Sequence, residues 1–321
     1  MKITKKILSA VTAFACAVGM MSVMGTAVSA AEQTYGVFTY VNNGSSIEIT
    51  DCDSKATSAK IPSEIGGVPV TSIGSYAFDG CYYIKSIVIP DSVKTIGDHA
   101  FFACFDLTNV SMTDSVTSIG EAAFYGCDSL RSIKLSDNLT ELSDQMLGGC
   151  DNLKSFNIPS KATTIGHHFV TGSQKLCVVT IPANITSIDY GAFSDCTNLN
   201  RITIENANCV INDSEITISN GWVYEGDVAD HVYFNGTIYG VGGSKAQAYA
   251  NKYGYRFATI GSAFKGDITA DGIINLYDAI EIAKSVMGMR TFTEAEVSAA
   301  DYNNDGVANL YDIVGIATEI M

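Results

Sequence analysis

Through the middle of the chain, aliphatic residues recur with a fixed period of 23 residues. The residues that open the successive units are Ile73, Ile96, Ile119, Leu142, Ile165 and Ile188. A unit this short cannot bury its own apolar side chains, so neighbouring units must stack and share one continuous core. The period therefore predicts a solenoid rather than a compact globule.

Other positions of the unit repeat in the same register. The pair Ala77-Phe78 follows the first opening residue, and the alternating pair Ile87/Ile89 follows later, as in a strand. A strand turns alternate side chains to opposite faces, so Ser86 and Val88 should point outward. The fifth unit departs from the pattern, because Phe169-Val170 replaces Ala-Phe and Ser173 replaces Cys. We expect a local bulge there and no break.

The N-terminus has the composition of a secretory signal peptide. Lys2, Lys5 and Lys6 precede an apolar run from Ile7 to about Val23, and Val28-Ser29-Ala30 offers a cleavage pattern. A membrane span is the weaker alternative, because the run barely reaches spanning length and no charged stop follows. We therefore expect a secreted, extracellular protein. Its formal charge of −15, about −18 without the signal, disfavours nucleic acid and anionic membranes as partners.

The cysteines follow the repeat. Cys16 belongs to the signal, and five others occupy the ninth place of the unit: Cys81, Cys104, Cys127, Cys150 and Cys196. Stacking makes this place a buried column, for which a small apolar thiol is well suited, so free thiols are favoured over the disulfides common in secreted proteins. A metal ladder would need clustered ligands at tetrahedral spacing. Cys52, Cys177 and Cys209 lie off the column and receive no role.

Two oxygen-rich loops occur near the C-terminus, over residues 267–278 and 301–312. The side-chain or carbonyl oxygens at positions 1, 3, 5, 7, 9 and 12 would come from Asp267, Thr269, Asp271, Ile273, Asn275 and Asp278, and from Asp301, Asn303, Asp305, Val307, Asn309 and Asp312. Calcium takes six to eight such oxygens, and the glycine at position 6 allows the loop to turn. The sequence predicts two calcium ions, with the first site weaker because Thr269 has no carboxylate. Sites that merely stabilise a small tail are the alternative.

Two family resemblances cover most of the chain. The pattern x-I-G-x-x-A-F-x-x-C-x-x-L-x-x-I-x-I-P, over residues 61–260, resembles the leucine-rich repeat of BspA-like bacterial surface proteins. The paired loops over residues 266–321, with Asp at position 12 and no entering helix, resemble a type I dockerin. The resemblance implies an α/β leucine-rich-repeat solenoid, mainly β with short helical turns and capped, followed by a small all-α calcium-binding dockerin with two loop–helix repeats.

The expected domains are a signal peptide over 1–30, an N-terminal cap over 31–60, repeats over 61–212, a C-terminal cap over 213–260, a linker over 261–265 and a dockerin over 266–321. Dockerins dock to a cohesin of the cellulosome, an assembly for polysaccharide degradation. The resemblance places the cohesin contact at Leu276, Tyr277, Ala283, Lys284, Leu310, Tyr311, Ala317 and Thr318. Because positions 10 and 11 agree in both loops, we expect two near-equivalent docking poses. Core positions for Leu276 and Leu310 are the alternative.

No catalytic motif stands out. The chain has four histidines, His99, His167, His168 and His231, and neither H-E-x-x-H nor G-x-S-x-G. A pair between Cys177 and a nearby histidine is conceivable, but solvated histidines are the simpler interpretation. Together with the two resemblances, which imply docking to a cohesin and binding of a protein by the repeats, this lack of a catalytic motif predicts a non-catalytic accessory protein. A dockerin-borne enzyme or a protease inhibitor of unrecognised type is the alternative.

The repeats offer two candidate surfaces. The outward strand positions are small and mostly polar, which suits a protein partner, and they lack the aromatic platform of a sugar binder. Aromatic residues gather along one edge instead, at Tyr82, Tyr83, Phe102, Phe105 and Tyr125. This edge is either an anchor for a partner or a cover for the core between repeats.

Overall fold

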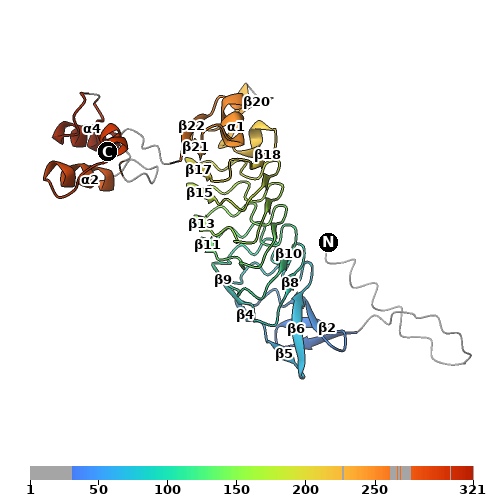
Figure 1. Cartoon of the computed structure of the whole chain (residues 1–321). Helices are drawn as coiled ribbons and strands as arrows, with labels where there is room; N and C mark the ends of the chain where they lie inside the picture. The colour runs from blue at the N-terminus through green and yellow to red at the C-terminus, as the bar shows by residue number, and fades with distance from the viewer. Residues whose placement is uncertain are drawn as a thin grey trace, which may run out of the picture. The chain divides into compact units, whose positions relative to one another are not determined.

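The computed structural model describes residues 31–225, 228–260, 266, 268, 276–303 and 305–320. The predicted signal peptide and linker lie outside these residues. Within them, no helix has both the length and the apolar character needed to cross a membrane. The middle of the chain is a stack of short turns, mostly β, as predicted (Figure 1).

A three-stranded meander covers the first repeat. Strands β1 (Glu32–Tyr35), β2 (Phe38–Asn42) and β3 (Ile47–Cys52) pair antiparallel. β3 then pairs in parallel with β6 (Val68–Ile73), which also forms a hairpin with β5 (Glu64–Ile65). Ile47 and Ile49 are fully buried, so this cap closes the end of the apolar column.

Two parallel ladders run along the array. One contains β6, β8 (Thr95–Ile96) and β10 (Ser118–Ile119), and continues as β12 (Glu141–Leu142), β14 (Thr164–Ile165), β16 (Ser187–Ile188) and β18 (Val210–Ile211). The other comprises β4 (Ser58–Lys60), β7 (Ser86–Val88), β9 (Asn109–Ser111), β11 (Ser132–Ile133), β13 (Ser155–Phe156), β15 (Val178–Ile181) and β17 (Arg201–Ile204). Strand pairing is interrupted between β10 and β12, between β9 and β11, and between β13 and β15.

A third wall, made of turns, is joined without interruption from Tyr76 to Thr217. Here backbone N–H groups donate to carbonyl oxygens of the next repeat, as from Phe101 to Ala123 at 2.8 Å and from Phe124 to Met146 at 3.0 Å. Each repeat also holds residues with positive φ, such as His99 at 56° and Ala103 at 54°. Left-handed residues end a helix, so these segments remain turns and do not extend into helices.

The core is a column of stacked side chains. Phe78, Phe101 and Phe124 are fully buried, with successive ring centroids 4.7 Å and 5.1 Å apart. The five cysteines of the ninth place are also fully buried, and none of the eight described cysteines forms a disulfide. Cys52 and Cys209 are buried as well, and Cys177 is exposed. The thiols thus fill the column as small apolar groups.

The fifth repeat perturbs one ladder only. Phe169 stands where most repeats have Ala, and it contacts Phe156 edge-on with ring centroids 5.4 Å apart. Phe156 and Ile158 are partly exposed, although their equivalents Ile133 and Leu135 are buried. β13 and β15 do not pair, while β14 still pairs with both neighbours. The solenoid continues through this repeat, but the expected bulge is replaced, within the described residues, by an interruption of one ladder.

The C-terminal cap continues the second ladder. β17 pairs with β21 (Thr237–Gly240), which pairs with β22 (Arg256–Thr259). Helix α1 (Lys245–Tyr253) begins where the Ser244 side chain accepts from the Gln247 N–H, and ends at Gly254 with φ 70°. The hydroxyl of Tyr249 donates to the Ser214 carbonyl at 2.9 Å. A short 3-10 turn, η1 (Glu215–Thr217), and a hairpin of β19 (Gly221–Glu225) and β20 (Val228–Tyr233) precede this cap.

The C-terminal module contains three helices, α2 (Leu276–Val286), α3 (Glu294–Ala300) and α4 (Leu310–Ile320). α2 and α4 pack on each other around a small core with Ile268, Ala279, Ile282, Ala300 and Ile316. The repeated loop–helix pattern predicts α2 and α4 but not α3. The sequence signal for α3 was Thr293 followed three residues later by Glu296, which is a capping box.

Candidate functional site

The second oxygen-rich loop, residues 301–312 without the undescribed residue 304, is folded around its own side chains. Both carboxylate oxygens of Asp301 accept backbone hydrogen bonds, from Asp305 at 2.9 Å and from Gly306 at 3.0 Å. Asp312 likewise accepts from the N–H groups of Asn303 at 3.1 Å and Asn309 at 2.7 Å. The predicted ligand residues are therefore held to one another across the loop.

Asp305 lies between two amide side chains. It accepts hydrogen bonds from the side chain of Asn303 at 2.9 Å and from the N–H of Val307 at 2.9 Å, which lower the pKa of its carboxyl group. Asn309 donates to the Val307 carbonyl at 2.8 Å. Gly306 has φ +88°, a conformation that a residue with a Cβ rarely adopts. The glycine predicted at position 6 therefore makes the sharp turn of the loop.

The charge of Asp312 indicates what the loop can bind. Its side chain is fully buried, and none of the ion pairs found among the described residues involves it. A buried carboxylate without a cationic partner is costly. The loop supplies only oxygen ligands, from three Asp and two Asn side chains and a carbonyl, which is the chemistry that calcium prefers. The residues thus fit a calcium ion.

The carboxylates are not yet gathered around one point. Over the described residues, no three His, Cys, Asp or Glu side chains form a group that could hold a metal ion. The carboxylates are turned onto backbone N–H groups instead, and each retains lone pairs. Of the first predicted site, Asp267, Thr269, Asp271, Ile273 and Asn275 lie outside the described residues. Its last ligand, Asp278, is fully buried, as is Asp312.

The two helices expose matched residues. Leu276 and Tyr277 are 63% and 71% exposed, and their equivalents Leu310 and Tyr311 are 61% and 77% exposed. The alternative that the two leucines belong to the core is therefore wrong.

One turn further along the helices lies a second matched pair, Ile280 and Val314, and both are exposed. This pair was absent from the predicted contact set. Its signal is the spacing of four residues from Leu276 and Leu310. Of the remaining predicted contacts, Ala283 and Ala317 are half-buried, and Lys284 and Thr318 are exposed.

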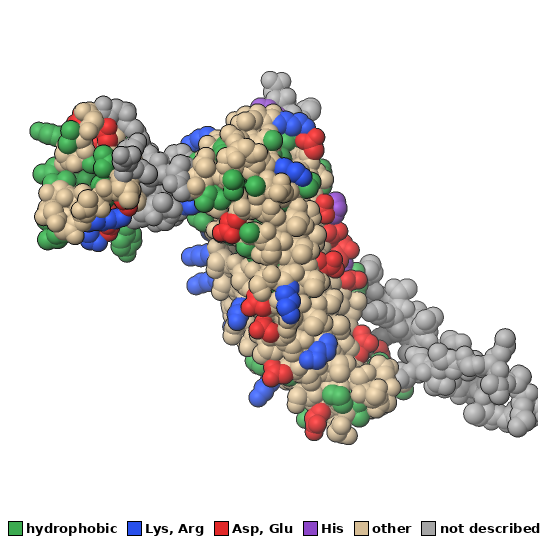
Figure 2. Space-filling view, in the orientation of Figure 1, with side chains coloured by type: hydrophobic (Ala, Val, Ile, Leu, Met, Phe, Trp, Pro, Cys, Tyr) green, Lys and Arg blue, Asp and Glu red, His purple; other side chains and the backbone are tan. Residues whose placement is uncertain are grey.

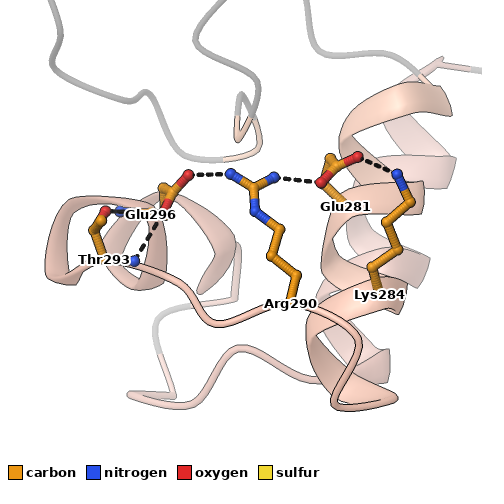
Figure 3. Close-up of polar contacts among 5 residues, drawn as sticks. All are labelled: Glu281, Lys284, Arg290, Thr293 and Glu296. Carbon is orange, nitrogen blue, oxygen red and sulfur yellow. Dashed lines mark hydrogen bonds and ion pairs between the residues drawn. The ribbon is translucent and has the colours of Figure 1, made fainter.

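Ion pairs connect α2 to α3. Arg290 bonds to both Glu281 and Glu296, and Lys284 pairs with Glu281 at 2.6 Å (Figure 3). Glu296 also accepts from the backbone N–H of Thr293 at 2.8 Å. The hydrogen bonds from Lys284 and Arg290 lower the pKa of Glu281. Arg290 thus fixes the segment between α2 and α3, and Lys284 is already engaged at the edge of the helix surface.

The predicted aromatic edge divides into two stacks. Tyr82 and Phe105 stack with ring centroids 5.3 Å apart, and Phe102 and Tyr125 stack at 5.5 Å. Tyr82, Tyr83 and Phe105 are exposed, whereas Phe102 and Tyr125 are half-buried. A Cβ built on Gly148 would lie 2.9 Å from the ring of Tyr125, so that ring packs directly on the next repeat. The second stack therefore covers the wall between repeats.

The histidines do not assemble with Cys177. The Cys177 thiol donates to the Lys175 carbonyl at 3.5 Å. His168 lies 3.4 Å from the Ser194 hydroxyl, and His167 lies 4.0 Å from a carboxylate oxygen of Asp189. A groove of about 440 Å³ is lined by Asp98, Glu141 and Asp144, among others, but by neither a histidine nor a cysteine. Among the described residues, Cys177 is therefore not paired with a histidine.

Comparisons with known proteins identify both modules. Residues 51–177 and 132–216 match the BspA type leucine rich repeat region, and residues 265–320 match the dockerin type I domain. A solved T. pallidum leucine rich repeat protein is 24% identical, with 71% of this chain and 98% of that chain covered and a TM-score of 0.53. This shows the fold. A Bacteroides ovatus leucine-rich repeat protein is 19% identical over 65% of this chain and 70% of that chain, with a TM-score of 0.40. No curated protein matches.

Proposed function

Because this chain belongs to the BspA-type leucine-rich-repeat proteins and ends in a type I dockerin, we propose that it is a secreted, non-catalytic accessory protein of a cellulosome. A dockerin implies docking to a cohesin, and leucine-rich repeats imply binding of a protein. The signal-peptide composition of residues 1–30 supports secretion. The absence of a catalytic constellation among the described side chains favours binding over turnover.

The observation that carries the docking proposal is the exposed, duplicated set of Leu276-Tyr277 and Leu310-Tyr311. Apolar and tyrosine side chains exposed together are typical anchors of protein interfaces. Each pair directly follows position 9 of its loop, so an ion bound to the loop would order the start of the helix that presents the pair. Calcium at both loops is part of the proposal.

The duplication supports two docking poses. α2 and α4 pack on each other and carry equivalent residues 34 positions apart, so a half turn of the module would exchange the two surfaces. The two poses differ because Lys284 on α2 occupies the position equivalent to Thr318 on α4. Lys284 is paired with Glu281. This difference biases the choice between the poses.

The proposal is tested with the secreted form of the whole chain and a panel of type I cohesins. Binding is measured by calorimetry in calcium and in EDTA, and plant polysaccharides and peptides are assayed for turnover in parallel. We expect calcium-dependent binding to at least one cohesin and no turnover. Binding that persists in EDTA would contradict the calcium part, and turnover lost on changing Cys177 or His168 would contradict the non-catalytic part.

A further inference from the structure

The outward surface of the second ladder carries cations and no acids. This surface, the strand face, comprises the residue before each strand and the first and third strand positions from β4 to β17: 57, 58, 60, 85, 86, 88, 108, 109, 111, 131, 132, 134, 154, 155, 157, 177, 178, 180, 200, 201 and 203. Its charged residues are Lys60, Lys85, Arg131, Lys134, Lys154 and Arg201. The chain has 34 acidic residues, and none of them lies on the strand face.

Within the described part of the chain, five of these six cations make no side-chain contact that would hold the fold together, and Arg201 is the exception. Among the described residues, none of them takes part in an ion pair. Arg201 lies over the Tyr239 ring at 4.2 Å and donates to Thr203 at 3.3 Å, and its Nη1 is buried without a hydrogen-bond partner within the described structure. The charges of Lys60, Lys85, Arg131, Lys134 and Lys154, which are exposed, are therefore available to a ligand.

The acids of the opposite edge behave differently. The carboxylate of Asp98 accepts from the N–H of Glu121 at 3.0 Å, and that of Asp144 accepts from the N–H of His167 at 2.8 Å. Each bond joins one repeat to the next. Figure 2 shows Lys and Arg side chains projecting from the edge that carries β11 to β17, and Asp and Glu side chains both on the adjoining face and along the opposite edge. Asp98 and Asp144 thus hold neighbouring repeats together, which the five exposed cations of the strand face do not do within the described structure.

A notch opens within the strand face where β13 and β15 fail to pair. It has a volume of about 60 Å³ and is lined by Phe156, Ile158, Leu176 and Val179, among others. The notch exists because Phe156, held against Phe169, is too large for the aliphatic column. An apolar side chain of a ligand would fill this space and cover the exposed part of Phe156.

The cations nearest the notch lie on its β13 side. Lys154 directly precedes β13, and Arg131 and Lys134 flank β11, the strand that pairs with β13. From β7 to β17 the strand face extends over five strand spacings, or about 24 Å, which an extended peptide of about seven residues would span. The geometry suits a linear ligand with several negative charges and one apolar group near its centre.

We propose that the strand face binds an acidic polypeptide segment, extended along the array, that places one apolar side chain in the β13/β15 notch. This rests on the proposed function of the repeats as a protein-binding surface, and it names the chemistry of the partner. Two features favour a polypeptide over other polyanions. The notch is apolar, and the strand face has none of the aromatic platforms on which single-stranded nucleic acids stack.

The test uses the secreted form of the whole chain and labelled peptides of about ten residues. The first peptide alternates Glu and Ser around a central Leu. The second replaces Glu by Gln, and the third replaces Leu by Ser. Fluorescence anisotropy should show the first peptide binding about tenfold or more tightly than the second, with affinity falling as salt increases. Equal binding of the Glu and Gln peptides would overturn the proposal.

Two variants locate the binding. The double reversal Lys134→Glu/Lys154→Glu should weaken binding of the Glu peptide about tenfold or more. The control Lys94→Glu/Lys161→Glu changes the net charge equally, at exposed lysines in the turns that lead into β8 and β14, and should leave affinity within about twofold. Phe156→Ile, which restores the aliphatic residue of most repeats, should remove the preference for Leu over Ser and leave the salt dependence.

Two further outcomes count against the proposal. If the control reversal weakens binding as much as the strand-face reversal, the strand face is not the site. If polygalacturonate or single-stranded oligo-dT binds as tightly as the Glu–Leu peptide and responds to the same reversal, the surface recognises polyanions rather than polypeptides. Cohesin binding is titrated on the same samples, so a failure of the docking proposal is recorded separately from a failure at the strand face.

Discussion

The thiol of Cys150 donates a hydrogen bond to the carbonyl oxygen of Phe124 in the preceding repeat, with an Sγ to O distance of 3.3 Å. Cys127 contacts Phe101 in the same way at 3.4 Å, and Cys196 contacts Val170 at 3.4 Å. These carbonyls face the interior of the solenoid, where water is absent. The cysteine column therefore does more than fill space, because each thiol adds a hydrogen bond to a carbonyl that also accepts from a backbone N–H group of its own repeat.

The first prediction concerns alkaline pH. Burial raises the pKa of Cys150 and of Cys196 to about 12, from an ordinary value of 9.0. The unfolded chain loses these protons first, so the stabilisation they give is complete below pH 9 and is lost as pH rises toward 12. The urea midpoint of the solenoid should fall in this range. Cys150→Ala should reduce the slope by about 1.4 kcal/mol per pH unit, and an unchanged slope would contradict the thiol account.

The second prediction concerns thiol reactivity. Cys177 is exposed, and the other seven described cysteines are buried. In the native protein, one thiol should react rapidly with a disulfide reagent, and Cys177→Ser should abolish that reaction. In denaturant all eight should react. A count below five after unfolding without reductant would show that the column forms disulfides in the secreted protein.

The third prediction concerns removal of calcium. EDTA should unfold α2 and α4, because Asp312 is buried without a cationic partner among the described residues and the module has only a small core. Far-ultraviolet circular dichroism should lose helical signal while the β signal of the solenoid remains. Asp312→Asn should weaken calcium binding about tenfold or more, and Asp91→Asn on the solenoid should not. A module that is already helical in EDTA would contradict this prediction.

The fourth prediction separates the two docking poses. Tyr277→Ala and Tyr311→Ala should each leave cohesin binding within about tenfold of the parent, since the other copy remains. The double variant should abolish detectable binding in calorimetry. Tyr35→Ala, at an exposed tyrosine of the N-terminal cap, serves as the control. If one single substitution removes all binding, there is only one pose.

The fifth prediction divides the aromatic edge by role. Tyr125→Ser should lower the free energy of unfolding by about 1–3 kcal/mol, because the ring stacks on Phe102 and packs over Gly148. Tyr83→Ser should change it by less than about 0.5 kcal/mol, since Tyr83 is 61% exposed. Chemical denaturation of both variants checks this. Equal losses would mean that the edge is structural throughout.

Much of the solenoid was predictable because the same requirement, a core shared with the neighbouring unit, recurs in every repeat. Ile73, Ile96 and Ile119 must occupy equivalent places if neighbouring units share a core, and all three are buried. The duplicated loops likewise predicted α2 and α4. Helix α3 lay outside this reasoning, since it interrupts the duplication and has only the capping pair Thr293 and Glu296 as its signal.

Features that depend on how repeats differ were not predictable. The period identifies Phe169 as irregular. It does not predict that the contact between Phe169 and Phe156 interrupts the ladder between β13 and β15. The strand-face cations occupy different positions within the 23-residue repeat. They form one surface only when the repeats are stacked. The exposed pair Ile280 and Val314 required knowledge of which helix faces pack together.

The uninterrupted wall of turns determines how the array can deform. Strand pairing is broken on both other sides, whereas the hydrogen bonds from Tyr76 to Thr217 join every repeat to the next. A force applied along the array would therefore be resisted mainly by the hydrogen bonds of this wall. The two interrupted ladders would separate more easily at their gaps. A pull on one end would lengthen the array first at its broken ladders, and recoil would follow when the pull ends.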